Sequence, residues 1–104
     1  GLAMSSRNRY LSPAERKTAL LIPKAIKIAR DYFEKGEIEA KLLLVELYEL
    51  FEGQPGTQID YISLVDIDDL EEVTNITQNT LLALAIRIGK TRLIDNHLFA
   101  EDVK

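Results

Sequence analysis

The stretch Gly53-Gln54-Pro55-Gly56 constrains the fold most, because the chain changes character on either side of it. Two glycines and a proline within four residues are typical of a turn. Before this turn the apolar residues recur every three or four positions, which is the spacing of one helix face. After it come runs rich in β-branched and aromatic residues, which are typical of strands. The sequence therefore predicts an α+β fold in which helices come first and strands follow.

The first predicted helix begins at Ser12, in the stretch "SPAE". Ser12 can cap free backbone N–H groups, Pro13 suits the first helical position, and Glu15 completes a capping box. Leu11 is placed to pack against the first turns. Pro23 removes one backbone hydrogen bond and clashes with the carbonyl four residues earlier, so it predicts a kink or break at that point.

The second predicted helix extends from about Glu37 to Glu52, after Gly36 ends the first. We expect its broad apolar face to pack on both a helix and a sheet. That face comprises Ile38, Leu42, Leu44, Val45, Tyr48 and Phe51.

Three strands are predicted after the turn, over residues 59–65, 81–88 and 91–95. The last two flank Gly89-Lys90 and are expected to form a hairpin. Residues 66–70 resemble a loop or one short helical turn, and the residues after Asn96 a short tail. The predicted fold is thus two N-terminal helices packed on a small, mainly antiparallel three-stranded sheet. Its uncovered face, lined by Tyr61, Ser63 and Thr91, would meet water or a partner domain.

Composition excludes several functional classes. The 104 residues suffice for one modest domain. A net charge of −4 and a pI of about 5.0 argue against a nucleic-acid surface, which needs clustered positive charge. The absence of cysteine excludes disulfides and thiolate zinc sites. No apolar run approaches the roughly 20 residues that a membrane span needs.

Most polar candidates have an ordinary interpretation. His97 is the only histidine; no nucleophile motif accompanies it, and we expect it on the surface. The acidic run from Asp66 to Glu72 lacks the glycine and terminal glutamate of a calcium-binding loop, so it predicts a solvated loop and no metal site. Gly89-Lys90-Thr91 resembles the end of a phosphate-binding loop. The glycine that such a motif requires five positions earlier is replaced by Leu84.

The segment before the first helix is different. Met4-Ser5-Ser6-Arg7-Asn8 offers two hydroxyl groups and a guanidinium within five residues of an acidic chain. An arginine fork matches phosphate oxygens, and backbone N–H groups at a helix start add to such a site. From the residues alone, a phosphate-binding loop and an ordinary flexible arm both remain open.

Three segments carry a resemblance to a known family: "GLAMSSRNRYLSPAER", "IDYISLVDIDDLEEV" and "LLALAIRIGKTRLIDN". They resemble, in order and separation, the C-terminal domain of the pantothenate synthetase (pantoate–β-alanine ligase) family. The resemblance implies an enzyme that uses ATP with Mg²⁺ to join pantoate to β-alanine through a pantoyl adenylate. It also implies an arm over residues 1–11 and a lid domain over residues 12–104.

The same resemblance assigns roles within the arm. Met4, Ser5, Ser6 and Arg7 match a loop that closes over ATP, with Arg7 as the catalytic residue. Fixed donors aimed at the departing pyrophosphate would lower the barrier. The N-terminal nucleotide-binding domain, through which the family dimerises, is expected upstream, together with the pantoate and β-alanine sites. The expected location is cytoplasmic.

The resemblance also implies that this chain alone does not catalyse. The alternatives are a non-enzymatic α+β module that binds another protein through its open sheet face, and a different adenylate-forming enzyme. An open reading frame that begins at this domain would favour the first. ATP use with another carboxylic acid would favour the second.

Overall fold

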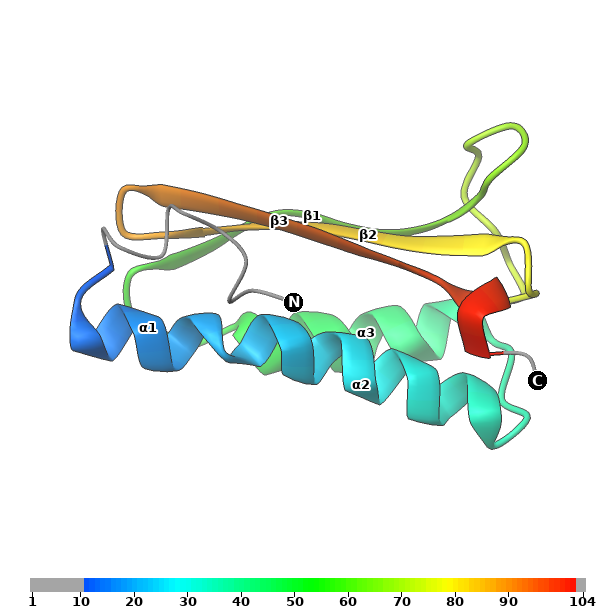
Figure 1. Ribbon diagram of the computed structural model, residues 1–104, viewed down its shortest axis with the longest axis horizontal. Helices are drawn as coiled ribbons and strands as arrows, with labels where there is room; N and C mark the ends of the chain where they lie inside the picture. The colour runs from blue at the N-terminus through cyan, green and yellow to red at the C-terminus, as the bar shows by residue number, and fades with distance from the viewer. Residues whose placement is uncertain (1–10, 103–104) are drawn as a thin grey trace.

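A layer of helices covers one face of a three-stranded antiparallel sheet (Figure 1). The computed structural model of the protein describes residues 11–102. The predicted α+β class and the antiparallel sheet are confirmed. In chain order the elements are α1 (Pro13–Ala19), α2 (Leu21–Glu34), α3 (Ala40–Phe51), β1 (Thr57–Asp66), β2 (Thr80–Ile88), β3 (Thr91–Leu98) and the 3₁₀ helix η3 (Phe99–Asp102).

The first predicted helix consists of two consecutive helices that meet at Leu20, the C-cap of α1 and the N-cap of α2. Pro23 lies in the first turn of α2, where a missing N–H leaves no intrahelical bond unmade. Its ring conflicts sterically with the carbonyl of the residue four positions earlier, Ala19, and the break occurs directly after that residue. The predicted interruption therefore exists but lies three residues before the proline.

The predicted start of α3 at Glu37 is wrong, because the helix begins at Ala40. The loop between β1 and β2 pairs with the residues before the helix. The Ile76 N–H donates to the Ile38 carbonyl at 2.7 Å, and the Ala40 N–H donates to the Thr74 carbonyl at 3.0 Å. Because these backbone groups are satisfied by the loop, the segment stays extended instead of joining the helix.

The predicted buried face of α3 is right only in part. Phe51 is buried, Leu44 and Tyr48 pack partly buried against the core, and the helix contacts both α2 and β1 as expected. The helix is apolar around most of its circumference, so its spacing fits two faces equally well. The side chains turned into the core are Ala40, Leu43, Leu47 and Phe51. Leu42 at 55% and Val45 at 48% are left about half exposed, as is Ile38 at 48%, which precedes the helix.

The sheet has the order β1-β2-β3, and consecutive strands are antiparallel. The two-residue turn Gly89-Lys90 pairs Thr91 with Ile88, which places Thr91 on the helix-covered face. The prediction that Thr91 lies on the open face is therefore wrong. Residues directly opposite each other in the sheet point to the same face, and its partner Ile88 is buried. Tyr61 and Ser63 alternate with the buried Ile62 and Leu64, so these two do lie on the open face. The core between the layers includes Ile22, Ala29, Leu43, Leu47, Leu64, Leu82, Leu84, Ile86 and Leu93.

The predicted tail after Asn96 is wrong. β3 continues to Leu98 and is followed by η3. Phe99 is fully buried, and its ring packs edge-on against Phe33 with centroids 5.2 Å apart. A single buried ring has no periodicity, so the sequence pattern does not reveal it. Within residues 11–102, the longest helix, α2, has 14 residues, and none combines the length and apolar character needed to cross a membrane.

Candidate functional site

Three chain segments meet at one end of the domain: the start of α1, the turn before β1 and the β2–β3 turn (Figure 1). The Gly89 N–H donates to the Gly56 carbonyl at 2.8 Å, which ties the two turns together. The carboxylate of Glu15 lies over Gly89, in the space that a Cβ would take. We call this region, residues 11–16, 55–57 and 88–91, the arm end, because the predicted ATP loop immediately precedes it in the chain.

The chain is held firmly where it enters the arm end. The Glu15 N–H donates to Ser12 Oγ at 3.1 Å, and the Ser12 N–H donates to Glu15 Oε1 at 2.9 Å. The predicted capping box is therefore confirmed. Leu11 is only 4% exposed and belongs to the core cluster. Cap and core together fix the chain at residue 11, directly after the segment that carries the candidate residues.

Beside the arm end, three charged side chains cluster on neighbouring strands. Asp60 Oδ2 accepts from Arg92 Nε at 2.7 Å and from Arg87 Nη2 at 3.4 Å. The hydrogen bond from Arg92, with the charge of Arg87 beside it, lowers the pKa of Asp60 below its usual value. The pairing register shifts between Ile59 and Tyr61, and such a bulge redirects the side chain at its centre. The Arg92 guanidinium also lies 5.9 Å from the Tyr61 ring centroid.

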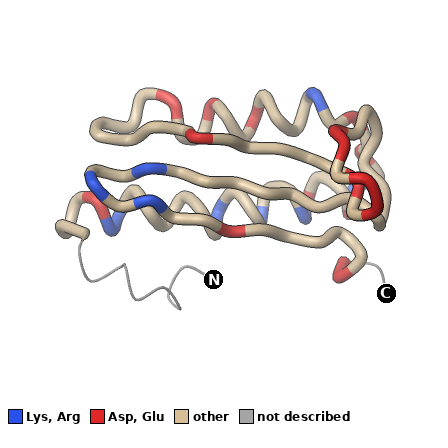
Figure 2. Tube along the Cα trace, turned by 90° about the horizontal axis from the view of Figure 1, so that it is seen from above, with Lys and Arg blue, Asp and Glu red and all other residues tan. Residues whose placement is uncertain are grey.

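Charge is distributed unevenly along the molecule (Figure 2). The tip of the β2–β3 hairpin carries Arg87, Lys90 and Arg92, close to the arm end. Acidic residues gather at the opposite end, in the β1–β2 loop and in η3. The hairpin tip thus concentrates basic side chains at the end of the molecule away from the acidic loop and η3, with Asp60 paired to two of them.

The acidic residues between β1 and β2 form a loop, as predicted, and their carboxylates accept hydrogen bonds from within it. Asp66 Oδ1 accepts from the Asp68 N–H at 2.8 Å, and Asp68 Oδ2 accepts from Asn79 Nδ2 at 3.0 Å. Asp69 Oδ1 accepts from the Glu71 N–H at 2.9 Å. From Leu11 to Asp102, no group of three or more His, Asp or Glu side chains is arranged to hold a metal ion.

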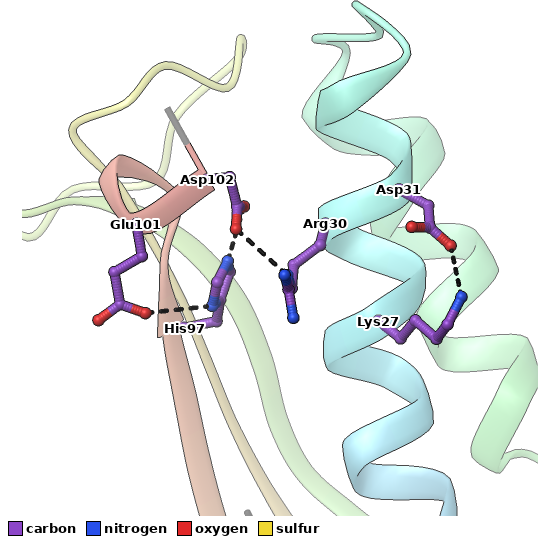
Figure 3. A network of polar contacts seen from close by, with 6 residues as sticks. All are labelled: Lys27, Arg30, Asp31, His97, Glu101 and Asp102. Atoms are coloured by element: carbon purple, nitrogen blue, oxygen red, sulfur yellow. Dashed lines mark hydrogen bonds and ion pairs between the residues drawn. The ribbon is translucent and has the colours of Figure 1, made fainter. Parts of the chain in front are cut away.

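His97 is not on the surface, so that prediction is wrong. Its side chain is 7% exposed, and Nε2 lies 2.7 Å from Oδ2 of Asp102, whose side chain is 2% exposed (Figure 3). Arg30 Nε, from α2, lies 3.2 Å from the other oxygen of Asp102. His97 shares its strand face with the buried Leu93, which is why it points inward. Through these contacts His97, Asp102 and Arg30 hold β3, η3 and α2 together.

A groove of about 420 Å³ between α2 and β3 lies near this network. Lys27 and Asp31 form an ion pair of 3.2 Å along α2 (Figure 3). Both line the groove together with Asp95 of β3. Because the wall carries charges of both signs, it does not select a ligand of one sign. The groove carries no functional assignment.

The predicted ATP-binding residues Met4, Ser5, Ser6 and Arg7 lie outside the residues that the structure describes. The described part contributes their attachment point, the arm end. Sequence reasoning missed the Asp60 cluster and the Glu15–Gly89 contact. Arg87 and Arg92 lie at equal distances from the two-residue turn Gly89-Lys90, so they are expected to face each other across the hairpin. This spacing was a partial signal for the Asp60 cluster.

Comparison with known proteins agrees with this architecture. Residues 1–98 match the family model described as pantoate-beta-alanine ligase. Pantothenate synthetase from Syntrophus aciditrophicus is 43% identical over 103 residues, which are 99% of this chain and 36% of that protein. The corresponding protein of Syntrophotalea carbinolica is 48% identical over 103 residues, with the same coverage.

The crystal structure of pantothenate synthetase from Thermus thermophilus superposes with a TM-score of 0.82 at 32% identity. It covers 95% of this chain, and this chain covers 36% of it. The chain thus spans about a third of the length of its relatives and aligns with their C-terminal part. A sequence match along nearly all of the chain and a shared arrangement of helices and sheet lead to one conclusion: this chain belongs to the pantoate–β-alanine ligase family.

Proposed function

We propose that this chain is the C-terminal lid domain of an ATP-dependent ligase that condenses pantoate with β-alanine. One observation supports this most directly: the whole chain, arm included, matches the C-terminal third of proteins named pantothenate synthetase. The carboxylate of pantoate would attack the α-phosphorus of ATP, giving pantoyl adenylate and pyrophosphate. The amine of β-alanine would then attack the acyl carbon and release AMP.

In this proposal the segment Met4–Arg7 contacts ATP. Met4 would contact the adenine through its backbone, while Ser5, Ser6 and Arg7 would hold phosphate oxygens. Charge accumulates on the pyrophosphate as it departs, so donors fixed in position stabilise the transition state more than the bound substrate. Arg7 would therefore contribute more to the rate than to ATP affinity. The Mg²⁺ that accompanies ATP would be bound by residues outside this chain.

The capping box and the buried Leu11 support a lid role, because they anchor the chain directly after the proposed ATP loop. Closure would bring the loop onto ATP and exclude water from the acyl adenylate. The remaining two-thirds of the enzyme would supply the nucleotide-binding domain, the pantoate and β-alanine sites, and the dimer contact. The isolated chain would accordingly be inactive. A cytoplasmic location stays a prediction.

A chimera tests the proposal. It joins the N-terminal part of the Syntrophotalea carbinolica relative to residues 1–104 of this chain, at the matching position. AMP release is measured with ATP, pantoate and β-alanine, omitting each in turn. We expect AMP only when all three are present. The unmodified relative serves as the positive control for the assay.

Arg7→Ala in the chimera should lower AMP formation by about 10²–10³-fold, the usual loss when one transition-state donor is removed. Arg7→Lys should recover only part of the rate, because a lysine keeps the charge but not the bidentate geometry. Arg9→Ala is the matched control, an arginine of the same arm outside the motif, and should keep most of the activity.

The outcomes separate the hypotheses. Full activity in Arg7→Ala would keep the family assignment but remove Arg7 from catalysis. No AMP from a folded chimera, while the relative is active, would favour a protein-interaction module. AMP formation with a different carboxylic acid would favour another adenylate-forming enzyme.

A further inference from the structure

The outer face of α3 carries apolar side chains that the domain itself leaves uncovered. Leu42 and Val45 lie about one turn apart, on the side of the helix that points away from the buried Leu43 and Leu47, and both are about half exposed. Ile38, which precedes the helix, is exposed to the same degree. A helix that is apolar around most of its circumference is normally packed on every side. This outer face of α3 is therefore a candidate contact surface.

The charges on the outer face of α3 are ordered along the helix. Lys41 lies in the first turn, whereas Glu49 lies in the last turn and Glu52 directly follows it. All three side chains are exposed, and none of the ion pairs within residues 11–102 includes them. Their order opposes the helix dipole, which favours anions at the start of a helix and cations at its end. A second helix that presents the same charges in the opposite direction would compensate both ends.

We infer that the outer face of α3 is a self-association surface, on which a second copy of this chain packs its own α3 antiparallel about a two-fold axis at Val45. Lys41 and Glu49 are each four positions from Val45, so this axis places Lys41 of one copy level with Glu49 of the other. Because a two-fold contact uses the same surface on both copies, association of the chain ends at a dimer. The inference does not depend on the proposed function, and it concerns a contact other than the one assigned there to the upstream part of the enzyme.

The same arrangement covers the exposed apolar side chains. The axes of packed helices lie about 8–10 Å apart, and side chains spaced by three and four residues interdigitate between them. Val45 then packs against Val45 of the second copy, with Leu42 beside it. One helix face from each copy is a small contact, so we expect weak association, with a dissociation constant between about 1 µM and 1 mM.

Sedimentation analysis of the 104-residue chain tests the inference, because a single copy has a mass of 11.8 kDa. The average mass should rise toward twice this value as the protein concentration increases from about 10 µM to about 1 mM. Leu42→Glu, which places a charge in the apolar contact, should weaken association by at least about 10-fold. Ile94→Glu is the matched control. It places the same charge at an equally exposed apolar position on the open sheet face, and it should leave association unchanged.

Charge reversal tests the antiparallel direction. Lys41→Glu and Glu49→Lys should each weaken association, because each brings like charges level across the contact. Combining the two substitutions in one chain exchanges the members of every pair and should restore association to near that of the parent chain. Melting temperatures recorded for dilute samples establish that each variant is folded.

Three results would overturn the inference. A parent chain that stays monomeric at the highest concentration would mean that another part of the enzyme covers this face. Association that Ile94→Glu abolishes and Leu42→Glu does not would place the contact on the sheet. A double charge reversal that fails to restore association would exclude the antiparallel arrangement. The charge-reversal series decides the question even if Leu42→Glu fails to fold, because it leaves the apolar side chains intact.

Discussion

Removing the Asp102 side chain should destabilise the domain far more than removing its neighbour Glu101. Asp102 is 2% exposed at its side chain and receives a 2.7 Å hydrogen bond from His97. Losing a charge-assisted bond of this kind costs about 1.5–3 kcal/mol. The contact with Arg30 adds about 0–1 kcal/mol, because Arg30 is 52% exposed and solvent screens the pair. Asp102→Ala should therefore cost about 1.5–4 kcal/mol.

The assay is urea unfolding of the 104-residue chain, followed by far-ultraviolet circular dichroism because the chain has no tryptophan. For a domain of this size, such a loss should also lower the melting temperature in a thermal scan by at least about 6 °C. Glu101→Ala is the control. Glu101 is 71% exposed and lies 3.8 Å from His97 Nδ1, so it should change stability by less than about 0.5 kcal/mol.

A double-mutant cycle with His97→Ala sharpens the test. If the two side chains stabilise the domain through each other, their coupling energy should be about 1–3 kcal/mol. Equal effects of Asp102→Ala and Glu101→Ala, or additive effects of Asp102→Ala and His97→Ala, would refute the reasoning. The C-terminal turn would then be held by Phe99 alone.

Two further predictions concern the sheet and α3. Asp60→Asn should destabilise the chain near neutral pH and progressively less in acid. Because the pKa of Asp60 is lower in the folded chain, its ionised carboxylate stabilises the fold at pH values above its unfolded pKa, near 3.8, and this stabilisation is lost as the pH falls through the lower folded pKa. Urea unfolding of both proteins at pH 7 and in acid measures the difference in stability. A difference that does not change with pH would contradict the prediction. On α3, Leu43→Ala should lower the free energy of unfolding by about 2–5 kcal/mol, because Leu43 is fully buried. Leu42 is 55% exposed, so Leu42→Ala should lower it by less than about 0.5 kcal/mol. Similar losses in the two variants would mean that the assigned buried face is wrong.

The sequence was informative where a signal was local. The capping box at Ser12 and Glu15, the strands around Gly89-Lys90 and the break near Pro23 each depend on residues a few positions apart. Such patterns can be read without knowing the rest of the fold.

The sequence was uninformative where two distant segments decide the outcome. The face of α3 depends on where the sheet lies, because the helix offers two apolar faces. His97 is buried because β3 extends to Leu98. Phe99 is buried because its ring packs against Phe33 of α2. The contact of Glu15 with Gly89 joins residues 74 positions apart in the chain, and nothing in the local sequence at either residue predicts it.

The sheet order, in which each strand pairs with the next along the chain, also bears on how the domain forms. Neighbours in the sheet are neighbours in sequence, so no crossover has to be threaded and the entropy lost in closing the loops is small. Pairing between strands that are adjacent in sequence shortens the sequence separation of these sheet contacts, which favours faster folding. Because residues 11–102 supply all three strands of this sheet, exchanging this segment between relatives would move the sheet as one block.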